Sequence, residues 1–229
     1  LVSGGIQDAR GVALVTAELY EPGPALVPAR LVYPQLALGG GFETLLFLTC
    51  VGSAPWVGTV ELDGGSWPLN QPWILDGIDH SGTSGFEVHL SQGETRKFVL
   101  SSPAGPFSGW LEVRGTGGSA IQDLTSAYFY NFTAQNQLED STGVAPSEPK
   151  AAVWFPIESS GSINTGLAIR LAPAVMVFSL YGQDGQLLEQ TQQNFEGARF
   201  FDQIFSQVPA NFVGSVKIES GVSFYLTVL

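Results

Sequence analysis

Only a few residues of this 229-residue chain could do chemistry, and the densest group lies between residues 67 and 85. Asp76, Asp79 and His80 form an Asp-x-x-Asp-His arrangement whose carboxylate oxygens and imidazole nitrogen are ligands for a divalent metal. The stretch lacks the denser alternating acidic spacing of a calcium loop. A solvated loop and a metal-binding loop both stay open; we favour the solvated loop and assign no metal.

Three tryptophans of the same region offer a second kind of site. Trp56, Trp67 and Trp73 could form an aromatic platform for sugar rings, as in carbohydrate-binding modules. Tryptophan is also a large hydrophobic contributor to protein cores, so the same residues could fill the interior of the fold. A platform needs at least two of these rings to be exposed and coplanar. We favour the core interpretation and keep a glycan as an alternative partner.

Patterns typical of enzymes are absent from the sequence: there is no nucleophile elbow, zinc helix, P-loop or dinucleotide fingerprint. The glycines at 39–41 precede a strand pattern without a Lys, which indicates a turn. His89 lies two residues from Glu87, as in an exposed polar ladder. Cys50 ends an apolar run with no cationic neighbour, as a buried thiol does. We therefore expect no enzyme, no catalytic residue and no cofactor.

The charge balance excludes further partners. Nine basic residues stand against 21 acidic ones, for a net charge of −12, which gives no footprint for nucleic acid or an anionic bilayer. The longest uncharged stretch, residues 44–60, is shorter than the roughly 20 apolar residues of a spanning helix, so we expect no membrane insertion. The low charge indicates an exported bacterial protein, in which the sequon at Asn131 usually has no role.

Short apolar runs and period-two alternation recur along the chain, whereas amphipathic helical periodicity is nearly absent. Turn signals such as Asp184-Gly185 separate the runs. This pattern favours an all-β, antiparallel β-sandwich architecture with one helical turn near residues 200–205. The strands expected are 12–20, 44–50, 57–62, 86–90, 95–100, 109–113, 125–132, 166–171, 175–181, 187–190, 214–218 and 222–229.

The sequence also repeats itself. Val32-Tyr33-Pro34 returns 122 residues later as Trp154-Phe155-Pro156. Residues 41–48 are matched by 162–169, and residues 109–113 by 214–218 at an offset of only 105. The second copy has therefore lost residues, which correspond to the insertion 64–85 of the first copy. Burial is expected at matching positions of the two copies, namely Phe42, Leu46, Leu48, Ile163, Leu167 and Ile169.

These repeats imply a domain organisation. We expect an N-terminal strand segment at 1–30, a first β-sandwich repeat at 31–133, a polar linker at 134–149 and a second β-sandwich repeat at 150–229. The linker contains two prolines and mostly polar residues.

The start of the first repeat resembles a known repeat family. The family begins with an aromatic-Pro-Gln-x-Ala motif, followed by a glycine-rich turn and a Thr-containing strand, and occurs in secreted and surface proteins of environmental bacteria. The second repeat matches loosely, because residues 158–161 replace most of the glycines. The resemblance implies an exported, non-catalytic protein of two tandem immunoglobulin-like or jelly-roll-like sandwiches. The residues that carry it are Tyr33, Pro34, Gln35, Leu36, Ala37, Gly39, Gly40, Gly41 and Thr44.

Each repeat closes with a similar strand, at 125–132 and 222–229, and a third copy at 12–20 precedes the first repeat. Both faces of this surplus strand are apolar, as in a strand buried on two sides. It could pack on its own repeat, mark a fragment end, or add to a sheet of a neighbouring chain and build a filament. We therefore expect a structural or adhesive protein of the bacterial surface that associates with itself or with other surface proteins. The candidate donor residues are Val12, Leu14, Val15, Leu19 and Tyr20.

Overall fold

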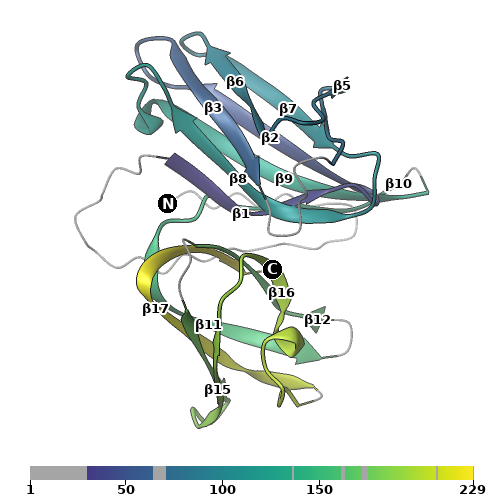
Figure 1. The fold of residues 1–229 in the computed structure, drawn as a ribbon, viewed down its shortest axis with the longest axis vertical. Coiled ribbons are helices and arrows are strands. Elements are labelled where there is room, and N and C mark those ends of the chain that lie inside the picture. The colour runs from purple at the N-terminus through teal and green to yellow at the C-terminus, as the bar shows by residue number, and fades with distance from the viewer. Residues whose placement is uncertain are drawn as a thin grey trace.

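The computed structural model describes residues 30–63, 71–135, 137–160, 163–171, 175–209 and 211–228. Strands make up 68% of the structure and helix 3%, and the sheets are antiparallel, so the predicted all-β sandwich fold is confirmed (Figure 1). The strands β1 to β10 form one unit, which we call the first sandwich, and β11 to β17 form a second, which we call the second sandwich.

The first sandwich consists of two facing sheets with one hydrophobic core between them. A four-stranded sheet has the order β1 (Arg30–Leu38), β8 (Phe107–Gly115), β3 (Trp56–Asp63) and β6 (Gly85–Leu90). A six-stranded sheet has the order β10 (Gln137–Gly143), β9 (Leu124–Ala134), β2 (Phe42–Cys50), β7 (Thr95–Ser101), β4 (Ile74–Leu75) and β5 (Ile78–Asp79).

Two stacked tyrosines join these sheets in the core. The rings of Tyr33 on β1 and Tyr128 on β9 lie 4.6 Å apart and nearly parallel. The Tyr33 hydroxyl contacts the Ser126 hydroxyl, and the Tyr128 hydroxyl donates to the carbonyl oxygen of Gln35 at 2.7 Å. Burial raises the pKa of both phenols well above its ordinary value, because the core disfavours the charged phenolate. The tyrosines are thus fixed as neutral core residues.

The glycine turn expected at 39–41 is present between β1 and β2. All three glycines have positive φ, and a Cβ on Gly39 would lie 2.5 Å from the carbonyl oxygen of Ala104. Only glycine fits such a turn. Leu46 and Leu48 beyond it are fully buried as predicted, whereas the prediction for Phe42 is wrong. Phe42 is partly exposed because it starts the strand at the rim, where it packs on Phe132.

The second sandwich is a single seven-stranded sheet curled around its own core. Leu167 and Ile169 are fully buried there, as predicted, while the side chain of Ile163 lies outside the described residues. A 3-10 turn at Phe201–Gln203 confirms the expected helical turn. The strands are β11 (Lys150–Ser160), β12 (Ile163–Asn164), β13 (Gly166–Leu171), β14 (Met176–Gly182), β15 (Leu187–Gln193), β16 (Gly197–Phe200) and β17 (Phe212–Val228).

One long strand, β17, takes the place of two strands of the first sandwich. Its first half pairs with β11 and β14, as β8 pairs with β1 and β3, and its second half pairs with β13, as β9 pairs with β2. The two strands predicted at 214–218 and 222–229 are therefore one continuous strand.

The register of pairing also repeats, which supports the internal repeat seen in the sequence. Val32 pairs with Glu112 across β1 and β8, and the matching residues Trp154 and Lys217 pair across β11 and β17. β15 and β16 repeat the pairing of β6 and β7 in the same way. The two sandwiches are thus two copies of one pattern of strand pairing.

The predicted linker at 134–149 is partly wrong, because residues 137–143 form β10 and pair with β9. Gln135, at a φ of 52°, turns the chain back on itself, and Val144 then inserts into the first core. β10 has almost no buried residue, so it lacks the apolar alternation that identifies a strand from sequence. The connection between the sandwiches is therefore confined to the few residues after Val144.

Candidate functional site

The predicted sugar platform does not form around Trp56 and Trp73. These side chains are 1% and 0% exposed. The Trp56 indole N–H donates to the carbonyl oxygen of Ala120 at 3.0 Å, and that of Trp73 donates to Thr83 at 2.9 Å. The platform prediction is therefore wrong for both residues, because each indole fills the first core and satisfies its polar atom there. Trp67 lies outside the described residues.

The carboxylates of the Asp76–Asp79–His80 arrangement hold the turns before and after β5. An Asp76 oxygen accepts from the backbone N–H of Val99 at 2.8 Å, and Asp79 accepts from the backbone N–H and hydroxyl of Ser81. The two hydrogen bonds from Ser81 lower the pKa of the Asp79 carboxyl group. The His80 ring packs against Trp73 at 4.9 Å. Within the described residues, no three His, Cys, Asp or Glu side chains are grouped so that they could hold a metal.

The remaining chemical residues have structural surroundings. His89 lies 3.7 Å from Glu87 on an exposed strand face, which confirms the expected polar ladder. Cys50 is fully buried and its thiol contacts the carbonyl oxygen of Ala54 at 3.3 Å, as expected of a small core residue. The candidate donor residues Val12, Leu14, Val15, Leu19 and Tyr20 all lie outside the described residues.

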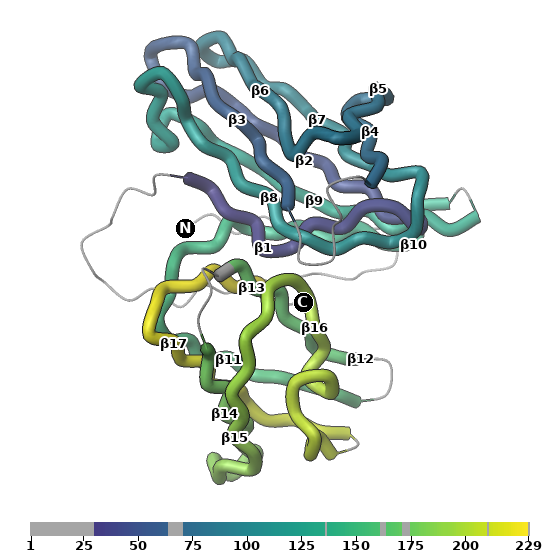
Figure 2. Tube along the Cα trace, viewed as in Figure 1, coloured from purple at the N-terminus to yellow at the C-terminus, as the bar shows by residue number. Residues whose placement is uncertain are grey.

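A surface that the sequence did not single out joins the two sandwiches. Val32, Trp110 and Glu112 point away from the first core, on the outer face of the four-stranded sheet, yet they are only 0%, 5% and 1% exposed. Strands β13, β16 and β17 of the second sandwich lie against β1 and β8 there (Figure 2). We call this outer face the covered face.

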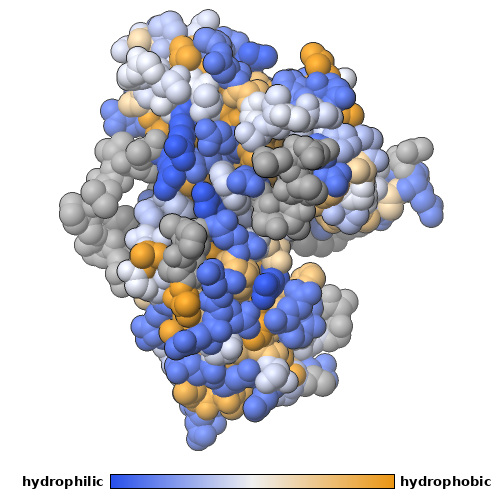
Figure 3. Space-filling view, viewed as in Figure 1, coloured by the Kyte–Doolittle hydropathy of each residue, from blue (hydrophilic) through white to orange (hydrophobic). Residues whose placement is uncertain are grey.

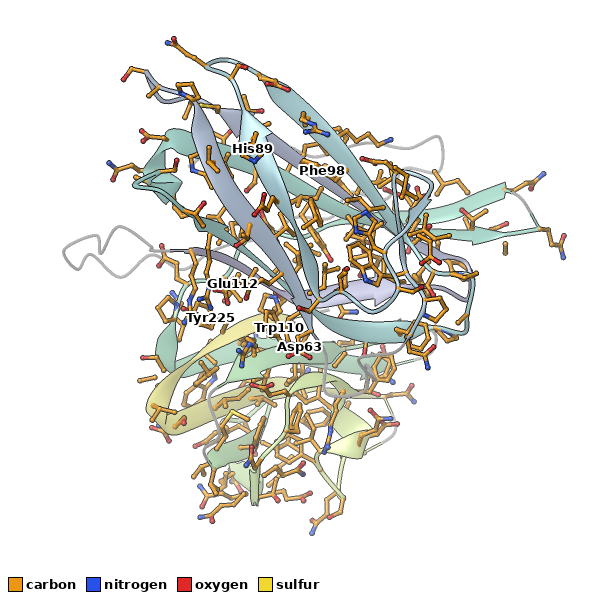
Figure 4. The ribbon with its side chains drawn as sticks, turned by 45° about the horizontal axis from the view of Figure 1, so that its top comes forward. Asp63, His89, Phe98, Trp110, Glu112 and Tyr225 are labelled. Atoms are coloured by element: carbon orange, nitrogen blue, oxygen red, sulfur yellow. The ribbon has the colours of Figure 1, made fainter. Side chains whose placement is uncertain are left out.

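A buried carboxylate lies at the centre of the covered face. Glu112 accepts from Arg30 at 3.2 and 3.3 Å and from the Nε of Arg114. Arg30 also donates to the hydroxyl of Tyr225 of the second sandwich at 3.1 Å. Figure 4 labels Tyr225 and Glu112. Burial works to lower the pKa of Arg30, but the Tyr225 hydrogen bond and the Glu112 charge outweigh it and raise the pKa. The guanidinium thus stays charged and links both sandwiches.

A cation–π contact adds a second link between the sandwiches. The guanidinium of Arg170 on β13 lies 4.2 Å from the centre of the ring of Trp110, which Figure 4 labels, and pairs with Glu196 at 2.6 Å. The connecting segment also bonds to both sandwiches. The Ser147 N–H donates to the carbonyl oxygen of Val32, and the Ser147 hydroxyl accepts from the N–H of Leu226. The contact therefore involves the four-stranded sheet of the first sandwich, the sheet of the second sandwich and the segment that connects the two sandwiches.

The matching face of the second sandwich is exposed, and we call it the open face. Trp154 lies in the position of Val32 but is 50% exposed. Its indole stacks on the ring of Tyr181 from β14, with centroids 4.7 Å apart. Lys217, in the position of Glu112, pairs with Glu219 at 2.8 Å, and this hydrogen bond raises the pKa of the amine. The open face thus carries a stacked aromatic pair beside an exposed ion pair.

Further apolar side chains extend the open face. Val213, on the same side of β17 as Lys217, is 41% exposed, and Leu187, which pairs with Tyr181, is 52% exposed. Figure 3 shows hydrophobic residues reaching the surface of the second sandwich. In the repeat alignment Trp154 occupies the position of Val32, so the sequence identified these two positions as equivalent. It did not indicate which of the two copies would be covered.

Comparison with known proteins gives no match: no family model fits the sequence, and no curated protein and no solved structure matches the chain significantly. Among the residues described, no helix is long and apolar enough to cross a membrane. The function of the chain must therefore be inferred from the covered face and the open face.

Proposed function

We propose that the chain is a non-catalytic structural or adhesive unit of the bacterial surface. The observation that carries this proposal is the covered face, where Trp110 and Glu112 are buried between two copies of one repeat. The buried Glu112 holds Arg30, which contacts the hydroxyl of Tyr225 on the second sandwich, and Arg170 of the second sandwich lies over Trp110. These contacts across the covered face set the relative orientation of the sandwiches. A stiff, repeat-built body of this kind is suited to spacing or attachment rather than to turnover.

The composition and the repeat motif support the location outside the cell. Charged residues make up only 13% of the chain, and the start of the first repeat resembles repeats of secreted and surface proteins. The proposal is tested by labelling intact producing cells with an antibody against the purified chain. Surface labelling that disappears after mild protease treatment of the cells is the expected result. Detection only after lysis would contradict the proposal.

Stiffness is tested on the purified chain by small-angle X-ray scattering. A single orientation of the sandwiches predicts one scattering profile from low to moderate salt. The variant Glu112→Gln weakens the contact and should broaden the distribution of distances within the molecule. A wild-type profile that already requires a mixture of orientations would contradict the structural role that we assign to the covered face.

For assembly, we propose strand addition by residues 12–20, whose two apolar faces are typical of a strand buried on both sides. The sheets offer unpaired edges for such a strand, because β6 and β15 each pair with one neighbour only among the described strands. Deleting residues 1–20 should leave folded protein that assembles less. Unchanged assembly of the truncated chain would contradict strand addition.

A second candidate function is carbohydrate binding at the open face, favoured by the exposed Trp154–Tyr181 pair. It is tested by co-sedimentation of the chain with insoluble cellulose and chitin. Binding that is lost in Trp154→Ala and kept in the control Val213→Ala would support this function. Equal binding by both variants would exclude the aromatic pair as the sugar site.

A further inference from the structure

The contact between the two sandwiches joins two different faces of the same repeat. The first sandwich uses its covered face, and the second uses the outer side of β13 and β17, where Ala168, Arg170 and Tyr225 lie. We call this second surface the Ala168 face. Ala168 is fully buried although it points away from the second core, between the inward Leu167 and Ile169. The contact is therefore heterologous, with unlike surfaces on its two sides.

Since both sandwiches share one pairing pattern, each has a counterpart of the face that the other uses. The counterpart of the covered face is the open face of the second sandwich. The counterpart of the Ala168 face lies on the first sandwich, on the outer side of β2, β7 and β9, and we call it the Phe47 face. Its apolar side chains are half-buried rather than covered, namely Leu45, Phe47, Val99 and Phe129.

Side-chain sizes at matching positions are exchanged between the two pairs of faces. In the internal contact, the large Trp110 of the covered face meets a surface that carries the small Ala168. On the open face the position of Trp110 is held by Ser215, and on the Phe47 face the position of Ala168 is held by Phe47. At these two positions each pair of faces combines one large and one small residue, as close packing favours, and Trp154 in the position of Val32 adds a second large side chain to the open face.

We propose that the open face of one copy of this chain packs on the Phe47 face of the next copy, so that chains assemble head to tail. This inference rests on the proposed function, because it names a second copy as the partner of the structural unit. A heterologous contact of this kind does not close on itself in general and therefore extends into a filament. β14 and β15, which carry part of the open face, lie at the end of the second sandwich remote from the first (Figure 2).

The aromatic pair on the open face favours a protein partner over a sugar. Trp154 and Tyr181 stack on each other, so one face of each ring is already occupied. Exposed Val213 and Leu187 widen the surface beyond the aromatic pair. Four strands spaced about 4.8 Å apart give a smaller area than the roughly 800 Å² per partner of a standard interface, so we expect weak association that needs high concentration.

The experiment is sedimentation velocity of the full chain over a concentration series, with two complementary variants. Trp154→Glu places a charge on the open face and leaves the Phe47 face intact, and Phe47→Lys does the reverse. Each variant alone should associate at least about tenfold more weakly than wild type, since an unpaired charge would be buried. The control Ile78→Glu changes a side chain that is 65% exposed on β5, outside both faces, and should associate as wild type does.

The decisive measurement is made on a mixture of the two variants. Phe47→Lys keeps its open face and Trp154→Glu keeps its Phe47 face, so an equimolar mixture should form dimers and nothing larger. Circular dichroism verifies the fold of each variant, and Leu187→Glu replaces Trp154→Glu if the latter does not fold.

Three results would overturn the inference. Because strand addition by residues 12–20 would also join chains, the variants are compared with residues 1–20 deleted. Phe47→Lys that then still dimerises alone would show that the open face pairs with itself. A wild-type chain that stays monomeric at the highest concentration would exclude the contact. A monomeric wild type that loses cellulose or chitin binding on Trp154→Glu would make the open face a sugar site. Because surface labelling of cells does not depend on any of these results, the proposed function can hold when this inference fails.

Discussion

The covered face and the open face occupy the same positions in two copies of one strand pattern, but they have opposite surroundings. Val32 is fully buried, whereas Trp154 at the matching position is 50% exposed. The difference lies in what packs against each sheet and not in the sheet itself. The comparison shows that a repeat can keep its register while the chemistry of one face changes from an internal contact to an available surface.

The largest expected effect comes from removing the tryptophan of the covered face. Trp110→Ala should lower the free energy of unfolding by about 3 kcal/mol or more, because a buried indole and its contact with Arg170 are lost. Trp154→Ala on the open face should cost less than about 1 kcal/mol, since half of that indole is already in water. Urea unfolding followed by circular dichroism measures both values. Similar losses would show that the two faces are equally buried in solution.

The next effect concerns the charged residues at the centres of the two faces. Glu112→Gln leaves Arg30 and Arg114 without their buried partner, and we expect a loss of about 2 kcal/mol, moderated because these guanidinium groups are 37% and 45% exposed. Lys217→Gln breaks only an exposed ion pair and should cost clearly less than Glu112→Gln. The measurement is urea unfolding at low and high salt. A loss for Glu112→Gln no greater than for Lys217→Gln would contradict the burial of Glu112.

A third prediction is that alkaline pH destabilises the core of the first sandwich more than the core of the second. The raised pKa of Tyr33 and Tyr128 means that the folded state holds these protons more tightly than the unfolded state. Their stabilising contribution is therefore complete below the ordinary phenol pKa of about 10 and is lost as the pH rises above it. The matching positions in the second sandwich hold Phe155 and Val228, which do not ionise.

The test of this prediction is an alkaline titration followed by circular dichroism. The double variant Tyr33→Phe, Tyr128→Phe should move the alkaline unfolding of the first sandwich to higher pH, and the exposed-face variant Tyr181→Phe should leave it in place. An unchanged transition in the double variant would show that other groups cause the alkaline unfolding.

The smallest expected effect lies at the hydroxyl that bridges the sandwiches. Tyr225→Phe removes the partner of the Arg30 Nε but keeps the ring beneath the guanidinium, and should cost about 1 kcal/mol. Thermal unfolding measures the loss, with Tyr181→Phe as the control on the open face. A loss equal to that of the control would mean that the hydrogen bond contributes nothing measurable.

Local patterns in the sequence predicted most of the fold. Period-two alternation located the strands around Leu46 and Leu167, and positive φ at the glycines after Leu38 agrees with the expected turn. The pattern failed where a strand has no buried side, as in β10. The sequence pattern also did not predict that β17 is continuous. The corresponding residues of the first repeat form two separate strands, and the alignment of the repeats carried that division over to the second.

The candidate site was less predictable, since burial of a tryptophan depends on distant parts of the chain. Trp73 lies in a polar, loop-like stretch but is fully buried, while Trp154 lies in an apolar strand and is half exposed. Spacing along the chain gives the side of a strand on which a residue lies. It does not tell whether another sandwich covers that side, because the contact between Trp110 and Arg170 joins residues far apart in sequence.

The long strand β17 has a consequence for the order in which the protein is made. The first sandwich can complete its core soon after β10 has been synthesised, when all strands of its two sheets are available. The second sandwich must wait for β17, the last of its strands, because β11, β13 and β14 all pair with it. Until then β11, β13 and β14 lack the strand that pairs with all three of them. The second sandwich should therefore stay unfolded during synthesis for some time after the first sandwich has folded.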